Sequence, residues 1–168
     1  MTATVKDDRR AFDRLYKELR QMGGMRVTIG VHDDTGQHEG GDATVAEVAA
    51  THEFGAGRIP ERSFLRSTFD RKEPQITEAL YDSVNEVAHD RLSPQQAMDR
   101  VGMVTRSLVQ DTMRAGINPP LAPSTLAARE AKASHGGGLQ SMEGQHTPLI
   151  DSGQLLASIT HKVEGAHG

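Results

Sequence analysis

Apolar residues recur along this chain at two different spacings, and each spacing predicts its own kind of element. Between residues 5 and 22 they recur every three or four positions, which predicts an amphipathic helix with one face formed by Phe12, Leu15, Tyr16, Leu19 and Met22. From Met25 to His32 apolar and polar residues alternate, which predicts a strand with one buried face. The alternation returns from Ser158 to Glu164, so we expect the two segments to pair.

The stretch from Val45 to Asp70 is the most densely organised part of the sequence. It begins with a short apolar helix, continues through a glycine-hinged loop and leads into a second, amphipathic helix. Gly55 and Gly57 allow backbone angles that other residues avoid, and Ile59-Pro60 favours an extended approach to the following helix. We interpret the stretch as a folding centre that presents a loop.

Two long helices are predicted in the middle of the chain. Glu73 to Leu92 has apolar residues at helical spacing, and Pro94 to Ala115 follows a strong start signal in which Ser93 and Gln96 can form a capping box. Shorter helices are expected over Leu126 to Lys132 and in one turn ending at Leu156, capped by Asp151 or Ser152. The predicted fold is α+β, a small antiparallel sheet flanked by the N-terminal helix and the two long helices.

We expect residues 1–168 to form a single domain with two flexible loops, at 33–42 and 133–146, because both segments are polar and rich in glycine. Hydrophobic residues make up 36% of the chain and aromatic residues only 4%, which predicts a thin core. A thin core often gains stability from neighbouring subunits, so we expect a homo-oligomer.

Charge and composition narrow the classes of function. The net charge of -4 argues against a protein that binds nucleic acid mainly by electrostatic attraction. Cysteine is absent, which removes thiol chemistry. The apolar runs are too short for a membrane span, and the first ten residues are too charged for a signal peptide.

The sequence offers little support for catalysis. The densest group of metal-binding residue types comprises His32, Asp33, Asp34, His38 and Glu39, but their spacing matches neither zinc nor calcium patterns, and a solvated loop is the simpler interpretation. Ser152 beside Asp151 is better explained as a helix cap than as a nucleophile. We therefore predict no enzyme activity, no metal site and no cofactor.

A run of basic residues follows the glycine loop and comprises Arg58, Arg62, Arg66, Arg71 and Lys72. Arg62 and Arg66 are four positions apart and are predicted to share one helix face. Two interpretations remain open for this face. It is either plain solvated surface, or a surface that pairs with acidic groups of a neighbouring subunit or lines a path for DNA without reading its sequence.

Three separated motifs resemble a known family. They are AATHEFGAGRIPERSFLR at 49–66, NPPLAPST at 118–125 and PLIDSGQLLASI at 148–159. In this order they are similar to the tail-completion and virion-morphogenesis proteins of tailed bacteriophages, which belong to the neck where head and tail join. The resemblance extends from about Val27 to Val163, and the segment 133–146 departs from it as an insertion.

The resemblance implies a structural virion protein, assembled in the host bacterial cytoplasm, that forms a six-membered ring through which DNA passes. Its expected partners are the tail terminator or tube proteins on one side and the head connector proteins on the other. The motif residues implied in packing or assembly are Phe54, Gly55, Arg58, Ile59, Arg62, Phe64, Arg66, Leu149 and Ile150. The loop from Gly55 to Arg58 and the loop after Val31 are the implied contacts between subunits.

Other functions remain open at this stage. Within the virion, a tail terminator or a connector ring protein has the same requirements. From a different class, an oligomeric binding module of a toxin-like or regulatory kind fits the composition, and a small metal-dependent hydrolase would use the histidine-containing loop.

Overall fold

The computed structural model describes residues 9–32, 36–38, 42–134, 147–149 and 153–165. Within these ranges the chain has the predicted α+β fold. Its elements in order are α1 (Arg9–Gly23), β1 (Arg26–Gly30), α2 (Val45–Phe54), α3 (Phe64–Ala88), α4 (Pro94–Arg114), α5 (Pro123–Ser134), α7 (Gln154–Ala157) and β2 (Thr160–Glu164). Most of the two predicted flexible loops, 33–35, 39–41 and 135–146, lies outside the described residues.

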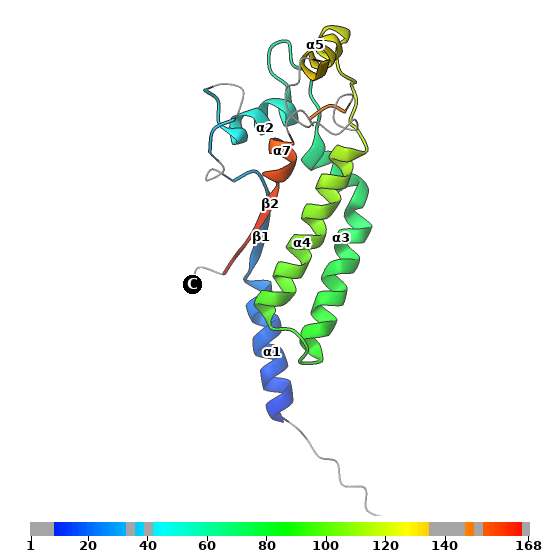
Figure 1. Cartoon of the computed structure of the whole chain (residues 1–168). Helices are drawn as coiled ribbons and strands as arrows, with labels where there is room; N and C mark the ends of the chain where they lie inside the picture. Colours follow the sequence, from blue (N-terminus) through cyan, green and yellow to red (C-terminus); the bar gives the residue numbers. More distant parts are fainter. Residues whose placement is uncertain (1–8, 33–35, 39–41, 135–146, 150–152, 166–168) are drawn as a thin grey trace, which may run out of the picture.

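The two predicted strands pair with each other, as expected. β1 and β2 run antiparallel, with Val27 opposite Val163 and Ile29 opposite His161. Both strands contact α4, so the sheet lies along one side of this helix while α3 lies along another (Figure 1). Helix α4 is therefore the central element, placed between the sheet and α3.

The start of α4 confirms the predicted capping box. The Ser93 hydroxyl accepts a hydrogen bond from the backbone N–H of Gln96, and the Gln96 side chain accepts one from the backbone N–H of Ser93. Pro94 occupies the first turn, where its missing N–H costs nothing. Along the helix, Ala97, Val101 and Val109 recur at intervals of four or eight and are buried.

The core consists of two clusters. The larger cluster joins α2, the start of α3, the end of α4 and the segment around α7 through Val45, Ala49, Phe64, Val109, Met113, Leu149, Leu155 and Ile159. The smaller cluster joins α1 to α3 and α4 through Met22, Val87 and Ala97. Since both are small, the prediction of a thin core agrees with the packing of the described residues.

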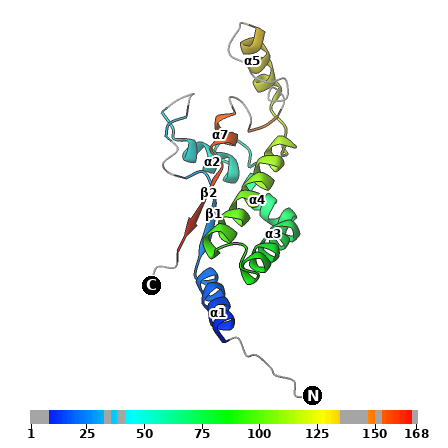
Figure 2. The same ribbon diagram turned by 60° about the horizontal axis from the view of Figure 1, so that its bottom comes forward.

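Helix α1 differs from the sequence prediction in what it buries. Of its predicted apolar face only Met22 is fully buried, whereas Phe12 is 67% exposed and Tyr16 is 58% exposed. The helix touches α3 and α4 through its C-terminal part, and the rest extends away from the body (Figures 1 and 2). The predicted apolar face is thus largely exposed among the described residues.

Helix α3 corrects a predicted boundary. Two helices were expected, one ending near Asp70 and one from Glu73 to Leu92, but one helix runs from Phe64 to Ala88 with Pro74 inside it. A proline removes one backbone hydrogen bond from a helix. The helix continues because it is packed on both sides of the proline, with Phe64 before it and Val87 after it fully buried.

Candidate interaction surface

The carboxylate of Glu53 is the centre of the polar contacts around the glycine loop. Glu53 is only 3% exposed, and its oxygens accept hydrogen bonds from Ser63 Oγ at 2.8 Å and from the backbone N–H groups of Leu65 at 2.9 Å and Arg66 at 3.0 Å. These two N–H groups belong to the first turn of α3 and have no partner within the helix. Glu53 therefore caps α3 from the end of α2, where its negative charge also suits the helix dipole.

Arg66 completes this arrangement. Its Nε lies 3.1 Å from Glu53 Oε1, and its Nη2 donates to Glu61 Oε1 at 2.6 Å and to the Glu53 carbonyl oxygen at 3.0 Å. Its guanidinium carbon lies 5.1 Å from the centre of the Phe54 ring, within cation–π range. The hydrogen bond with Glu53, followed by that with Glu61, raises the pKa of Arg66 above its ordinary value.

Arg62 does not share a helix face with Arg66, as the sequence had suggested, because α3 begins only at Phe64. Arg62 is 5% exposed and points inward, where its Nε donates to the Pro119 carbonyl at 2.8 Å and its Nη2 to the Pro120 carbonyl at 2.9 Å. Burial, with a smaller effect of Arg129, lowers the pKa of Arg62. Arg62 thus joins the glycine loop to the segment around Pro119 and Pro120, which we call the proline segment.

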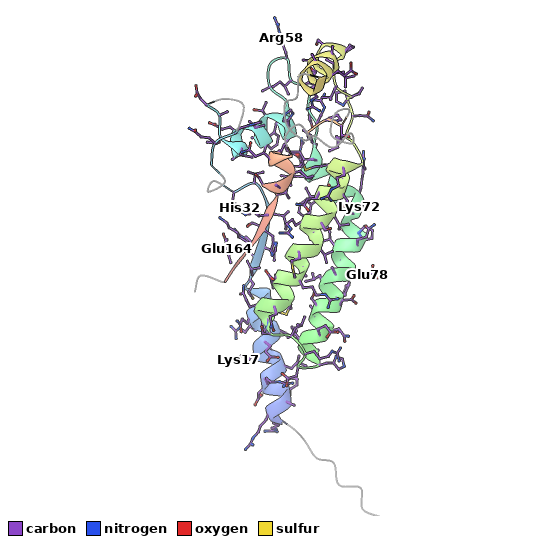
Figure 3. The ribbon with its side chains drawn as sticks, in the orientation of Figure 1. Lys17, His32, Arg58, Lys72, Glu78 and Glu164 are labelled. Atoms are coloured by element: carbon purple, nitrogen blue, oxygen red, sulfur yellow. The ribbon has the colours of Figure 1, made fainter. Side chains whose placement is uncertain are left out.

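The loop between these anchors is a tight turn. Ala56 and Ile59 exchange backbone hydrogen bonds of 3.0 and 2.9 Å, and Gly55 has a φ of 72°. A Cβ at Gly55 would lie 2.9 Å from the backbone nitrogen of Glu61, so only glycine fits there. Arg58 lies at the tip of the loop and points away from the body (Figure 3).

A cavity of about 550 Å³ lies behind this loop. It is bordered by α2, the segment before α3, the proline segment, α5 and α7. Among the described residues, its lining includes no carboxylate and five basic or titratable nitrogen side chains, namely His38, His52, Arg58, Arg62 and Arg129. Burial, followed by the charges of Arg62, His38 and Arg129, lowers the pKa of His52 and so favours its neutral form.

The histidines considered as metal ligands in the sequence, where a solvated loop was preferred, have other contacts. His32 Nδ1 lies 2.8 Å from Thr160 Oγ1, which ties the end of β1 to β2, and His38 lines the cavity. Asp33, Asp34 and Glu39 lie outside the described residues. In the part of the chain that the structure describes, no three histidine, aspartate or glutamate side chains are grouped closely enough to hold a metal ion.

The structure brings most of the predicted assembly residues into one region, but some of them are exposed and others are buried. Phe54, Arg58 and Ile59 are exposed around the loop, and Gly55 shapes it. In contrast, Phe64 and Leu149 are buried in the larger core cluster and, like Arg62, offer no surface to another chain. Ile150 lies outside the described residues.

The sequence alone assigned no role to two polar residues that prove important in the packing, Glu53 and His161. His161 is largely buried, with its Nε2 2.8 Å from Asp99 Oδ1 on α4. Two features of the sequence could have pointed to them: Glu53 is a carboxylate just before a glycine turn, and His161 lies on the apolar side of a strand.

Comparisons of the chain with protein-family models, curated proteins and solved structures found no match. None of the helices in the described ranges combines the length and apolar character needed to cross a bilayer.

Proposed function

We propose that this chain is a structural subunit of a tailed-bacteriophage virion, a tail-completion or neck protein whose ring joins the tail to the head and lets DNA pass. In this proposal the subunit acts by shape and by buried interface, without catalysis or a cofactor. The loop from Gly55 to Arg58 and its neighbours Phe54 and Ile59 contact an adjoining chain of the assembly. We call these six positions, Phe54 to Ile59, the contact loop.

The observation that carries the proposal is the way in which buried charges hold the contact loop. Glu53 fixes one side of it through α3, and Arg62 fixes the other side through the proline segment. Burying a charged group is costly unless all its hydrogen bonds are made. A loop held this firmly while its tip stays exposed is suited to binding, because a preordered loop loses little entropy when a partner docks.

The chemistry of the contact loop also supports an interface. Phe54 and Ile59 are large apolar side chains on the surface, and Arg58 is exposed beside them. Aromatic residues and arginine are enriched in protein–protein interfaces. The three sequence motifs that resemble tail-completion proteins cover this loop, the proline segment that Arg62 binds, and α7, so they fall on parts of the molecule that pack together.

The experiment is a phage-production assay with Arg58→Glu and Ile59→Glu introduced together. Both side chains are exposed, so the free subunit keeps its thermal stability while head–tail joining falls at least about tenfold, the effect of removing one interface hot spot. The matched control is Ala127→Glu with Ala128→Glu on the exposed face of α5, which leaves joining unchanged. Normal joining by the loop variant removes the contact loop from the proposal.

Electron microscopy of virions distinguishes the proposal from its alternatives. A ring of this chain is expected at the neck, between tail and head. A position at the last tube ring or inside the head would instead assign the terminator or connector role. A chain absent from virions would contradict the proposal and favour an oligomeric binding module.

A further inference from the structure

Helix α1 carries an apolar ridge that nothing covers within the described chain. Phe12, Tyr16 and Leu19 follow one another at intervals of four and three, and all three are exposed. The Phe12 and Tyr16 rings are stacked, with centres 6.5 Å apart and planes 17° apart. A free helical arm of this length is marginal in water, so a continuous apolar ridge on it indicates a surface that packs against another chain.

The same helix is strongly basic. Arg9–Gly23 contains five basic and two acidic residues. Arg20 lies four positions after Tyr16, and Arg9 lies three positions before Phe12, so both flank the ridge within one helical turn. A partner for this ridge should therefore present apolar side chains beside acidic ones.

The outer side of α3 has this composition. Within the described part of the chain, a shallow groove there is lined by Glu73, Pro74, Thr77, Glu78, Tyr81 and Asp82, with three carboxylates and no basic residue. Tyr81 is 72% exposed, and its neighbour Leu80 is exposed as well. Glu78 points away from α4, on the free side of the helix pair (Figure 3).

We propose that the apolar ridge of α1 in one subunit packs along the groove on α3, between Glu73 and Asp82, in a second copy of this chain. Phe12, Tyr16 and Leu19 then cover Tyr81 and Leu80, while the arginines beside the ridge face the carboxylates of the groove. Two charged surfaces of opposite sign favour correct alignment of the subunits and speed their encounter.

The two surfaces are different patches of one chain, so the contact is heterologous. Each subunit offers one ridge and one groove, and repetition of the same step produces a ring when the rotation closes. This inference rests on the proposed function and deepens it, because it names the faces through which the ring is built. The contact loop remains available for adjoining proteins.

The test uses two full-length variants that each lose one face. The ridge variant carries Phe12→Glu and Tyr16→Glu, and the groove variant carries Leu80→Glu and Tyr81→Glu. All four side chains are exposed, so both variants keep the wild-type melting temperature. Each variant alone is expected to be monomeric by size-exclusion chromatography with light scattering, where the wild type gives a closed oligomer.

Mixing the two variants in equal amounts gives the decisive result. The ridge variant keeps an intact groove and the groove variant keeps an intact ridge, so one junction forms for each pair. The mixture should give heterodimers and nothing larger, because the second junction would place added carboxylates against the acidic groove. The control carrying Ala127→Glu and Ala128→Glu assembles like the wild type.

Several outcomes overturn the inference. A monomeric wild type does so, as do rings formed by either variant alone, or a mixture that remains monomeric or forms rings. If both variants still form rings like those of the wild type, the proposed function stands and only this interface is removed. Heterodimers from the mixture, combined with virions that lack the chain, would retain the interface and remove the neck function.

Discussion

His161 on β2 lies so close to Gly102 on α4 that a Cβ at position 102 would come within 2.3 Å of the imidazole Cδ2. The absence of a side chain at Gly102 lets the strand approach the helix, and the bond from His161 to Asp99 holds the ring in place. This contact fixes the sheet against the central helix.

We expect Gly102→Ala to destabilise the fold by about 1 to 3 kcal/mol, the usual effect of overpacking, even though alanine favours helices. Thermal or urea unfolding monitored by circular dichroism measures the change. The matched control is Gly23→Ala, since a Cβ there meets nothing within 4 Å. A Gly102→Ala protein as stable as the control would contradict the close packing of strand and helix.

Glu53→Gln should lower the free energy of unfolding by about 2 kcal/mol or more. The amide keeps only one acceptor oxygen, so it cannot accept both hydrogen bonds that the two carboxylate oxygens receive from the first turn of α3, and a buried donor is left unmatched. The comparison is Glu61→Gln, which alters the exposed partner of Arg66 and should cost less than about 1 kcal/mol. Equal effects of the two changes would show that Glu53 has no special capping role.

Arg62→Glu should prevent stable folding of the free subunit, with a loss of about 3 to 5 kcal/mol, because it places a buried carboxylate against the carbonyl oxygens of Pro119 and Pro120. Arg58→Glu, at the exposed loop tip, should change stability by no more than about 0.5 kcal/mol. Urea titrations of both variants provide the measurement. A stable Arg62→Glu monomer with an assembly defect would restore the surface role expected from the sequence.

His52 should make the protein less stable in mild acid. Its pKa in the folded state is lowered, chiefly by burial, so the unfolded chain binds the proton first as the pH falls. His52 makes no pH-dependent contribution to stability when it is neutral in both the folded and the unfolded state. Its contribution becomes unfavourable as the pH falls below about 6.5. Urea unfolding between about pH 8 and pH 5 should show a smaller loss of stability for His52→Gln than for the wild type. Identical pH profiles would contradict this role of His52.

The sequence pattern was sufficient to predict those elements that depend on residues close together in the chain. The alternation in β1 and β2 gave their pairing, and Ser93 with Gln96 gave the start of α4, because period and capping depend on near neighbours. The continuity of α3 through Pro74 was not predictable in this way, since burial at both ends of the helix outweighs the missing hydrogen bond.

The candidate site was only partly accessible from sequence for the same reason. The position and glycine content of the contact loop could be read directly. The inward direction of Arg62 depends on the carbonyls of Pro119 and Pro120, which are 57 and 58 residues away. Likewise, the exposure of Phe12 and Tyr16 depends on how much of α1 packs against the other helices. The spacing of apolar residues in the sequence does not show this.

The pairing of β1 with β2 also constrains how the subunit is made. Thr28 and Lys162, which face each other across the sheet, are separated by 134 positions. A ribosome must therefore synthesise α3 and α4 before the partner of β1 emerges, and until then neither edge of β1 is paired with a described strand. Unpaired strand edges invite wrong pairing. The sheet can therefore form only when synthesis of the chain is nearly complete. This favours folding of each subunit before it joins another.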